Sequence, residues 1–425
     1  MPAEEKILTE KPRLLIILNR FVIGGQTVDI IPLAWYLKKE FEILIVYGEK
    51  EKDEIEPFFL LEKFPGLQLK KICHLRKSIN PLTDIIAFFK LVSLISSFKA
   101  DIVHTHFAKA GFLGRMAAFC CGVPVIVHTF HGHFFHSYFS TSFSRIIAAF
   151  ERNMTKISSA VVCLSKTQLH ELVNVFKVVP LKKIKIIPLG VNPNSNVSPA
   201  SSRTNFRSRY GLHETDVAIG IVGRLVPIKN HSFFIDVISH IFNEAPDKVP
   251  AVFIVGDGSL RVEIENELRE KNMPFSNESI TPTTRIVFTS WLTDMYEVMN
   301  GLDIIALTSL NEGTPLSVIE AQCFKKPVIA TNVGGVKDTM TNNITGFLID
   351  GHNVHNYAAK LRELINNKEL RSTMGEEGKK LTSLKFSKES EIAATRELYY
   401  SLLSAKGYRF QQNDAPVPYL NPIQL

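Results

Sequence analysis

Short runs of β-branched and other apolar residues recur along the chain, and a segment with helical spacing of apolar positions follows each run. This alternation predicts parallel β-sheets covered by helices on both faces, because parallel strands are joined by crossover helices. In the first half, the predicted strands are residues 13–19, 41–47, 101–106, 124–129, 160–165 and 185–189. After a stretch rich in Pro, Asn and Ser, the rhythm restarts with strands at 217–222, 251–255, 285–289, 303–308, 327–331 and 347–350.

Two rounds of this alternation predict two Rossmann-like α/β domains, since a chain of 425 residues is too long for one ordinary core. We assign residues 1–190 to the first domain, 191–205 to a hinge and 206–405 to the second domain. Residues 389–403 are typical of a closing helix, and 406–425, with three prolines, of a loosely ordered tail. Ligands bind beyond the carboxyl ends of such strands, so two facing domains predict a shared site in the cleft between them.

The charge of the chain is unevenly distributed. Residues 1–190 contain 25 Lys and Arg against 16 Asp and Glu, whereas residues 191–425 contain 24 against 26. The basic first half favours an anionic partner such as nucleic acid, an anionic membrane or a phosphorylated substrate, although a solvated basic face remains the alternative. Nucleic acid is disfavoured, because no compact stripe of Lys and Arg alternates with aromatic residues.

Five cysteines show no paired spacing, and most lie in apolar runs; they are Cys73, Cys120, Cys121, Cys163 and Cys323. This pattern predicts a reduced cytoplasmic protein without structural zinc. The first residues lack the apolar segment of a signal peptide, and no run reaches the roughly 18 apolar residues of a spanning helix. Any membrane contact is therefore expected to be peripheral and on the inner face.

Basic residues follow the first predicted strand of the second domain. Gly223 allows the backbone to approach a ligand closely, and Arg224 and Lys229 come just before a predicted helix at 231–241. A diphosphate is favoured there by both the charges and the helix dipole. Solvated surface side chains are the alternative for an isolated Arg and Lys.

A second segment with phosphate-binding features follows the predicted strand at 303–308. Its residues are Glu312, Gly313, Thr314, Pro315, Leu316, Ser317, Val318, Ile319 and Glu320. Thr314 suits the N-cap and Pro315 the first helical position, which leaves the amides of Leu316 and Ser317 free for a phosphate. Glu320 would reach a sugar or ribose diol from inside the helix, while Glu312 precedes it. An acidic cap and a surface glutamate are the alternative reading.

Three segments together resemble the retaining family-four glycosyltransferases of the GT-B fold. They are Gly-Arg-Leu-x₃-Lys, Glu-Gly-x-Pro-Leu-Ser-x₂-Glu and residues 327–335. Gly24 and Gly25 resemble the glycine-rich loop of the family, with Gln26 and Thr27 where an acidic residue is usual. Residues 188–192 resemble the interdomain linker of the family. The segment 101–106, with Lys109 and Arg115, is similar to members that act in bacterial surface-polysaccharide and lipopolysaccharide synthesis.

The resemblance implies transfer of a sugar from a nucleotide diphosphate, with UDP as the expected nucleotide. Arg224 and Lys229 would neutralise the departing phosphate, Glu320 would hold the ribose, and Glu312 would position the donor sugar. His131, which precedes Gly132, matches the family's active-site histidine. The leaving phosphate would accept the acceptor's proton during same-face attack. Because no Asp-x-Asp run is present to hold Mg²⁺ or Mn²⁺, we expect metal-independent chemistry without a cofactor.

The catalytic assignment is His131, Glu312, Arg224 and Lys229. The donor-binding assignment is Gly24, Gly25, Gly223, Arg224, Lys229, Glu312, Gly313, Thr314, Pro315, Leu316, Ser317 and Glu320. Other strand-end histidines could instead line the wall of the site; these are His104, His106, His133 and His136. A metal site among the histidines is disfavoured because no cysteine or carboxylate lies nearby at ligand spacing.

The expected acceptor is a glycan or a polyprenyl-diphosphate-linked oligosaccharide, or a lipopolysaccharide core. The aromatic stretch at 134–150, followed by Arg152, could dock on an anionic inner leaflet, with a core helix as the alternative; the run at 85–98 is expected to be core. A GT-B epimerase or phosphorylase is the alternative enzyme. An inactive partner subunit is disfavoured, because the four charged residues of the two donor segments are all present.

Overall fold

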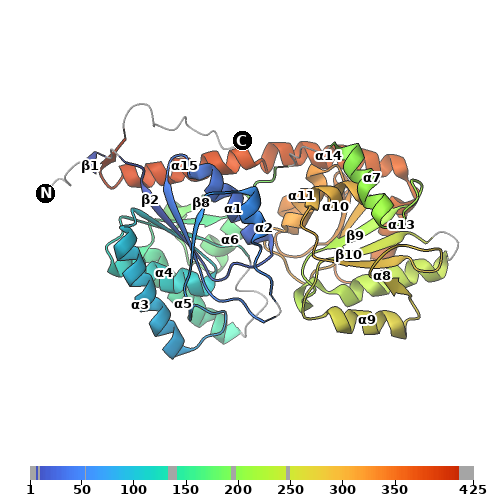
Figure 1. The fold of residues 1–425 in the computed structure, drawn as a ribbon, viewed down its shortest axis with the longest axis horizontal. Helices are drawn as coiled ribbons and strands as arrows, with labels where there is room; N and C mark the ends of the chain where they lie inside the picture. Colours follow the sequence, from blue (N-terminus) through green and yellow to red (C-terminus); the bar gives the residue numbers. More distant parts are fainter. Residues whose placement is uncertain are drawn as a thin grey trace. The chain divides into compact units, whose positions relative to one another are not determined.

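The computed structural model describes residues 6–7, 10–52, 54–132, 141–192, 198–245 and 249–410. Internal contacts divide the chain into two units, unit 1 with Met1–Gly190 and Lys388–Leu425, and unit 2 with Val191–Ser387 (Figure 1). The chain thus crosses from unit 1 to unit 2 after Gly190 and returns at Lys388.

In the described part of unit 1, a sheet of seven parallel strands has the order β4-β3-β2-β5-β6-β7-β8. The strands are β2 (Arg13–Leu18), β3 (Glu42–Tyr47), β4 (Gln68–Lys71), β5 (Ile102–His106), β6 (Val125–Thr129), β7 (Ala160–Cys163) and β8 (Ile184–Ile186). All six strands predicted in this half are confirmed. The edge strand β4 was not predicted, because its polar, largely exposed sequence lacks an apolar run.

Helices cover both faces of this sheet, which explains why its strands are almost continuously apolar. Leu14 and Ile16 of β2 pack with α1 (Gly25–Leu37), α2 (Phe59–Lys63) and α15 (Lys388–Ser404). Leu15 and Ile17 point to the opposite face and pack with α3 (Pro81–Phe98) and α4 (Ala108–Cys120). Further along follow α5 (Thr141–Ile157), α6 (Lys166–His170), η1 (Glu171–Val175) and η2 (Leu181–Lys183).

Unit 2 repeats this plan within its described residues, with seven parallel strands in the order β11-β12-β10-β9-β13-β14-β15. The strands are β9 (Ala218–Val222), β10 (Ala251–Val255), β11 (Phe275–Ser276), β12 (Ile286–Ser290), β13 (Ile304–Leu307), β14 (Val328–Thr331) and β15 (Gly346–Ile349). Six of these were predicted. The two-residue edge strand β11 is too short to produce an apolar pattern.

The helices of unit 2 also form two layers. One face of the sheet packs with α8 (His231–Glu244), α9 (Arg261–Glu270) and α13 (Val354–Asn366). The other packs with α7 (Pro199–Arg209), α10 (Met295–Gly301), α11 (Leu316–Cys323) and α12 (Val336–Thr339). The short η3 (Pro227–Lys229) precedes α8, and α14 (Lys368–Lys385) precedes the return to unit 1.

The last helix, α15, belongs to unit 1 and not to the second domain, to which the sequence assigned residues up to 405. Its residues Leu398 and Leu403 join the core that α1 covers. Lys388 at its start is buried and contacts Asp29 of α1 at 2.7 Å and Glu391 at 2.5 Å. Beyond it, β16 (Tyr408–Arg409) pairs with β1 (Lys6–Ile7), so the start of the predicted tail is a strand; residues 411–425 lie outside the described ranges.

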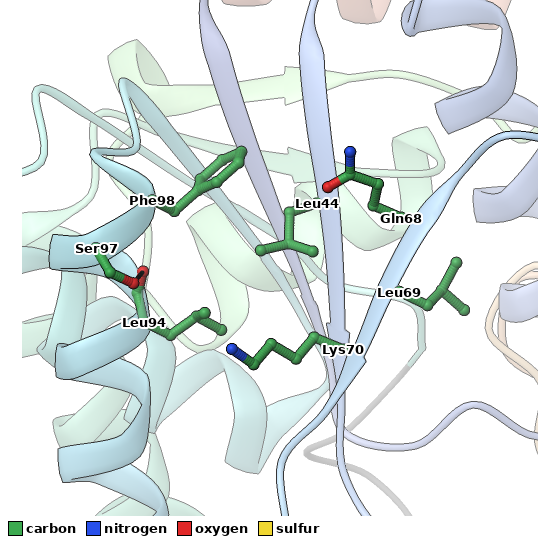
Figure 2. Close-up of a pocket in the computed structure, with 7 residues that line it drawn as sticks. All are labelled: Leu44, Gln68, Leu69, Lys70, Leu94, Ser97 and Phe98. Atoms are coloured by element: carbon green, nitrogen blue, oxygen red, sulfur yellow. Dashed lines mark hydrogen bonds between the residues drawn. The ribbon is translucent and has the colours of Figure 1, made fainter.

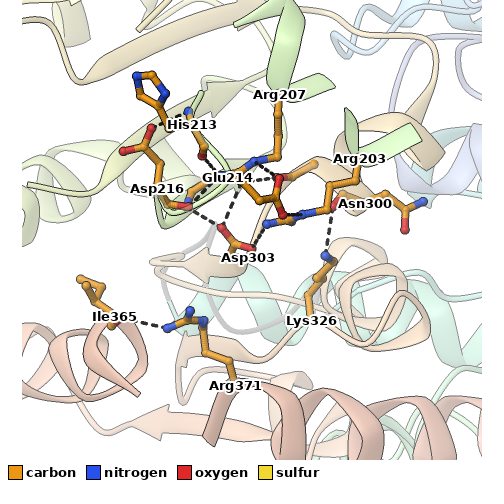
Figure 3. A network of polar contacts seen from close by, with 12 residues as sticks. Arg203, Arg207, His213, Glu214, Asp216, Asn300, Asp303, Lys326, Ile365 and Arg371 are labelled. Atoms are coloured by element: carbon orange, nitrogen blue, oxygen red, sulfur yellow. Dashed lines mark hydrogen bonds and ion pairs between the residues drawn. The ribbon is translucent and has the colours of Figure 1, made fainter. Parts of the chain in front are cut away.

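Part of the predicted hinge is helical, because α7 begins at Pro199. The Ser198 hydroxyl caps it by accepting a bond from the Ser201 amide at 3.1 Å. Arg203 anchors the helix by binding Asp303 at 2.9 Å (Figure 3). Asp303 also accepts the Ala218 amide at 2.8 Å. This polar network fixes the amino ends of β9 and β13 and therefore stabilises the sheet away from its ligand-binding end.

Helix α3 is apolar on two opposite faces. Four residues on one face are buried, namely Ala87, Leu91, Leu94 and Ile95. The prediction that this segment is a core helix is therefore correct for that face only. Within the described ranges this is the one helix that is long and apolar enough to cross a membrane, with a mean hydropathy of 1.5. The expectation that no run reaches such a length was wrong, because the scattered polar residues of this segment are mostly uncharged.

Candidate active site

The predicted donor residues of unit 2 lie in loops that follow neighbouring strands. β9, β13 and β14 are adjacent and parallel, so their carboxyl ends lie at the same end of the sheet. The loop after β9 contains Gly223, Arg224 and Lys229, the loop after β13 contains Glu312 and Gly313, and the loop after β14 contains Gly334. The fold therefore brings together segments that are far apart in the sequence.

Lys229 and Glu312 form the central contact of this site. The Lys229 Nζ donates to Glu312 Oε1 at 2.6 Å, and the Ser309 hydroxyl donates to the same oxygen at 2.6 Å. Both charged side chains are mostly shielded, with exposed fractions of 21% and 12%. The buried Thr308 hydroxyl donates to the Lys229 carbonyl at 3.1 Å and so joins the two loops. Two predicted site residues thus meet, with Ser309, which sequence analysis missed, as their support.

Glycines allow these loops to approach one another. Gly334 has φ of 51°, and a Cβ there would lie 2.0 Å from the Glu312 carbonyl oxygen. The same carbonyl accepts the Gly335 amide at 3.0 Å. Gly256, at the end of β10, has φ of 132°, and a Cβ there would lie 2.0 Å from the Gly223 carbonyl oxygen. Gly256 was missed, although its position directly after a predicted strand was an available signal.

Helix α11 begins one residue later than predicted. Pro315 has ψ of 107° and stands before the helix as its N-cap, so Thr314 is not the N-cap and Pro315 is not the first helical residue. The Pro315 carbonyl oxygen accepts the first helical bonds, from the Val318 amide at 3.2 Å and the Ile319 amide at 3.4 Å, as the carbonyl of an N-cap residue does. No described side chain caps this end, and the Leu316 and Ser317 amides belong to its first turn, as a phosphate site requires. Glu320 is the fifth residue of α11 and is partly exposed.

Arg224 is exposed on the loop after β9. In unit 1, Gly24 and Gly25 occupy the corresponding place after β2, where α1 begins at Gly25 with an extended Gly24 as its N-cap. No described side chain caps this turn. The positions of the glycines suit the predicted backbone contact with a phosphate or sugar, while their role stays a prediction.

Histidines gather where β5 and β6 end in unit 1. The His106 Nδ1 lies 2.7 Å from the His131 Nε2, so one ring donates to the other. His104 is buried between the Tyr399 hydroxyl, 2.6 Å from its Nδ1, and the Thr129 hydroxyl, 2.7 Å from its Nε2. His104 therefore links β5 and β6 to α15, whereas His106 positions His131.

Burial keeps this cluster uncharged at neutral pH. Desolvation lowers the pKa of His131 to about 4, although the nearby Asp29 carboxylate acts in the opposite direction. Desolvation also lowers the pKa of His104 to about 3, and the proximity of His131 lowers it by a smaller amount. The His131 Nδ1 is buried without a partner among the described residues. A neutral His131 can thus exchange a hydrogen bond with a substrate hydroxyl but carries no charge for a phosphate.

His133 and His136 lie outside the described residues, as do residues 134–140 of the aromatic stretch proposed for docking. Among the described residues, no group of three or more His, Cys, Asp or Glu side chains could hold a metal ion. Figure 2 shows a pocket of about 550 Å³ in unit 1, between the end of α3 and strands β3 and β4. Leu44, Lys70 and Phe98 line it, and none of the predicted site residues does.

The two doubly wound parallel sheets, with fixed charges and amide groups at the ligand-binding end of the second, define a GT-B glycosyltransferase that uses a nucleotide sugar. Residues 202–381 match the sequence model of the glycosyl transferases group 1, and residues 23–195 match that of glycosyltransferase family 4. The chain belongs to this family of retaining glycosyltransferases.

Two bacterial glycosyltransferases are among the proteins with similar sequences. The Escherichia coli UDP-Gal:α-D-GlcNAc-diphosphoundecaprenol α-1,3-galactosyltransferase is 31% identical over 297 residues, which cover 69% of this chain and 74% of that protein. The Staphylococcus aureus capsular polysaccharide biosynthesis glycosyltransferase CapM is 26% identical, over 79% of this chain and 86% of CapM. Anabaena Alr3699/HepE, solved with UDP and glucose, has the same fold, with a TM-score of 0.74 at 18% identity over 91% and 99% of the two chains.

Proposed function

We propose that the protein transfers a hexose from a UDP-sugar to a polyprenyl-diphosphate-linked glycan during cell-envelope polysaccharide synthesis, without a metal ion. The name of the E. coli relative specifies UDP-galactose as donor and a diphosphoundecaprenol-linked sugar as acceptor, and CapM acts in capsule synthesis. HepE was solved with UDP. These similarities support the choice of donor and acceptor class for this chain.

The observation that carries the proposal is the Lys229–Glu312 contact beside the start of α11. A donor diphosphate would take Glu312's place at the Lys229 ammonium, so that a fixed cation meets the charge that grows on the leaving group. Arg224 and the first amides of α11 would bind the remaining phosphate oxygens. These groups supply the charge that a metal ion would otherwise provide.

The released Glu312 carboxylate would then accept hydrogen bonds from the donor sugar, and Glu320 from the ribose. The acceptor hydroxyl oxygen bonds to the anomeric carbon on the face from which UDP departs, as the bond from that carbon to the diphosphate oxygen breaks. The acceptor proton passes to the leaving phosphate oxygen. The products are UDP and a glycoside of unchanged anomeric configuration, and the neutral His131 contributes a hydrogen bond to a sugar hydroxyl.

The test uses the purified protein with UDP-galactose or UDP-glucose and GlcNAc-diphospho-undecaprenol, after treatment with EDTA. We expect UDP release that requires the acceptor, and a new α-glycoside detected by NMR. Donor consumption without a glycoside would instead indicate an epimerase. Product formation that requires inorganic phosphate would indicate a phosphorylase, and transfer restricted to free oligosaccharides would contradict the lipid-linked acceptor. Lys229→Ala serves as the low-activity control.

A further inference from the structure

Helix α3 carries an exposed apolar face that the active site does not use. Leu82, Ile85, Ile86 and Phe89 lie on this face, and Leu82 and Phe89 have exposed fractions of 76% and 64%. Ile79, just before the helix, is 81% exposed. Four large apolar side chains within two turns form a continuous stripe, whereas single exposed apolar residues are ordinary. We propose that this stripe docks the protein on the surface of an anionic lipid bilayer.

The opposite face of α3 determines how the helix can meet a membrane. Ala87, Leu91, Leu94 and Ile95 lie on that face and are buried. All except Ala87 are large, and they pack on the sheet core with α4, beside α3 in Figure 1. A helix that crossed the bilayer would have to leave this core. The helix therefore lies in the membrane interface with only its outer face in contact with lipid.

The charges around the stripe identify an anionic partner. Residues 76–99 contain four basic residues, Arg76, Lys77, Lys90 and Lys99, and one acidic residue, Asp84. Asp84 is paired with Lys109 and is mostly buried, so it presents little negative charge to a membrane. Lys77 precedes the stripe and Lys90 directly follows Phe89, and both are exposed. Arg76 is also exposed but is paired with Glu49 at 2.6 Å, so Lys77 and Lys90 carry most of the positive charge beside the stripe. Apolar side chains bordered by cations match acyl chains beneath anionic headgroups.

The same charges disfavour a second copy of the chain as the occupant. In a symmetric dimer each surface meets itself, so the stripe of one copy would bring its own basic border against the same lysines of its partner. Anionic headgroups, in contrast, neutralise these cations. The inference does not depend on the identity of the sugar donor or acceptor, so failure of the transfer assay would leave it standing.

The test is flotation of the full chain with vesicles of phosphatidylcholine alone or of an equimolar mixture with phosphatidylglycerol. We expect binding to the anionic vesicles that weakens as salt rises. The double variant Leu82→Ser with Phe89→Ser should lower the partition coefficient about tenfold or more, since each side chain loses its burial in lipid. Lys77→Glu with Lys90→Glu should weaken binding to anionic vesicles only.

Leu384→Ser in α14 of unit 2 is the matched control, because Leu384 is also helical and 61% exposed. It should bind vesicles as the unaltered protein does, and all variants should keep the same thermal unfolding midpoint and turnover on a water-soluble acceptor. Equal vesicle binding by the Leu82/Phe89 variant and the unaltered protein would overturn the proposal. So would concentration-dependent dimerisation without flotation that disappears in that variant, which would assign the stripe to a second copy.

Discussion

The Lys229 ammonium lies 2.6 Å from the Glu312 carboxylate, although 83 positions separate the two residues. Both side chains were assigned to the donor site for different tasks, the first for the leaving phosphate and the second for the sugar. Their contact means that each satisfies the other before the donor arrives. On the proposed mechanism, donor binding would give Lys229 a new ionic partner, whereas Glu312 would exchange its cation for hydrogen bonds from the donor sugar.

Lys229→Ala should lower kcat by about 10²–10³-fold, because the alanine removes a fixed cation that binds the leaving phosphate most tightly in the transition state. Lys229→Arg should restore part of the rate, since it keeps the charge but changes its position. Steady-state kinetics with a radiolabelled donor give kcat and the apparent KM.

Glu320→Ala is the contrasting variant, because loss of a ribose contact should mainly raise the apparent KM for the donor. Identical effects of the two alanine variants on kcat and KM would contradict the assigned roles.

Binding of UDP should stabilise the protein in the presence of EDTA, because Arg224, Lys229 and the first amides of α11 supply the favourable charge. At a UDP concentration one hundred times Kd, the gain should be about 2.7 kcal/mol. Thermal unfolding with UDP, with and without EDTA and then with added Mn²⁺, measures this gain. A stabilisation that disappears in EDTA and returns with Mn²⁺ would show that the metal-free site is wrong, and Lys229→Ala should lose most of the shift.

The sheets could be predicted because both of their faces are covered, which makes central strands such as β2 and β9 continuous apolar runs in the sequence. The edge strands β4 and β11 could not be predicted. Strand β4 is exposed to solvent on one side, which permits Lys70 and Lys71, and β11 has only two residues. Helix α15 illustrates a different limit. Its position in the chain led to its assignment to the second domain, because the contacts of Leu398 and Lys388 with α1 can be recognised only in three dimensions.

The placement of the candidate donor residues in neighbouring loops could be predicted from their order after strands, since the carboxyl ends of β9 and β13 lie side by side. Their pairing could not, because it depends on the loop conformation that Ser309 and Gly334 permit. The start of α11 was placed one residue too early, because proline is favoured at the first helical position but its fixed φ also allows the extended conformation that Pro315 has here. Helical spacing likewise could not show which apolar face of α3 is covered.

Gly334→Ala should damage both stability and transfer. Its φ of 51° is unfavourable for alanine, and the new Cβ would collide with the Glu312 carbonyl oxygen at 2.0 Å. The loop must move, which displaces Glu312 and costs about 1–3 kcal/mol. Gly351→Ala is the matched control in unit 2, with φ of 69° and nothing within 4 Å of a Cβ. It should lose about 1 kcal/mol of stability but retain full turnover. Equal losses of turnover would contradict a role for close loop packing in positioning Glu312.

The buried histidines of unit 1 should make its stability depend on pH. Burial holds the pKa of His104 at about 3 and that of His131 at about 4, below the value of 6.5 that each regains on unfolding. Between those values and 6.5 the unfolded chain binds more protons, so stability is fully present above about pH 6.5 and is lost as the pH falls through that value towards 4. Each histidine should contribute about 1.4 kcal/mol per pH unit within its window.

His104→Gln isolates one of these contributions, because glutamine can still hydrogen bond with Tyr399 and Thr129 but does not titrate. From pH 7 to pH 5, the variant should lose about 2 kcal/mol less stability than the parent protein. Trp35 lies in α1 of unit 1 and Trp291 in unit 2, so urea unfolding in a Trp291→Phe background reports unit 1 through Trp35 fluorescence. If the glutamine packs imperfectly, the variant loses the same amount of stability at pH 7 and at pH 5, so the change in stability between the two pH values is unaffected. Parallel pH profiles for the parent and the variant would mean that His104 has the same pKa in the folded and unfolded states, against its burial between two hydroxyl groups.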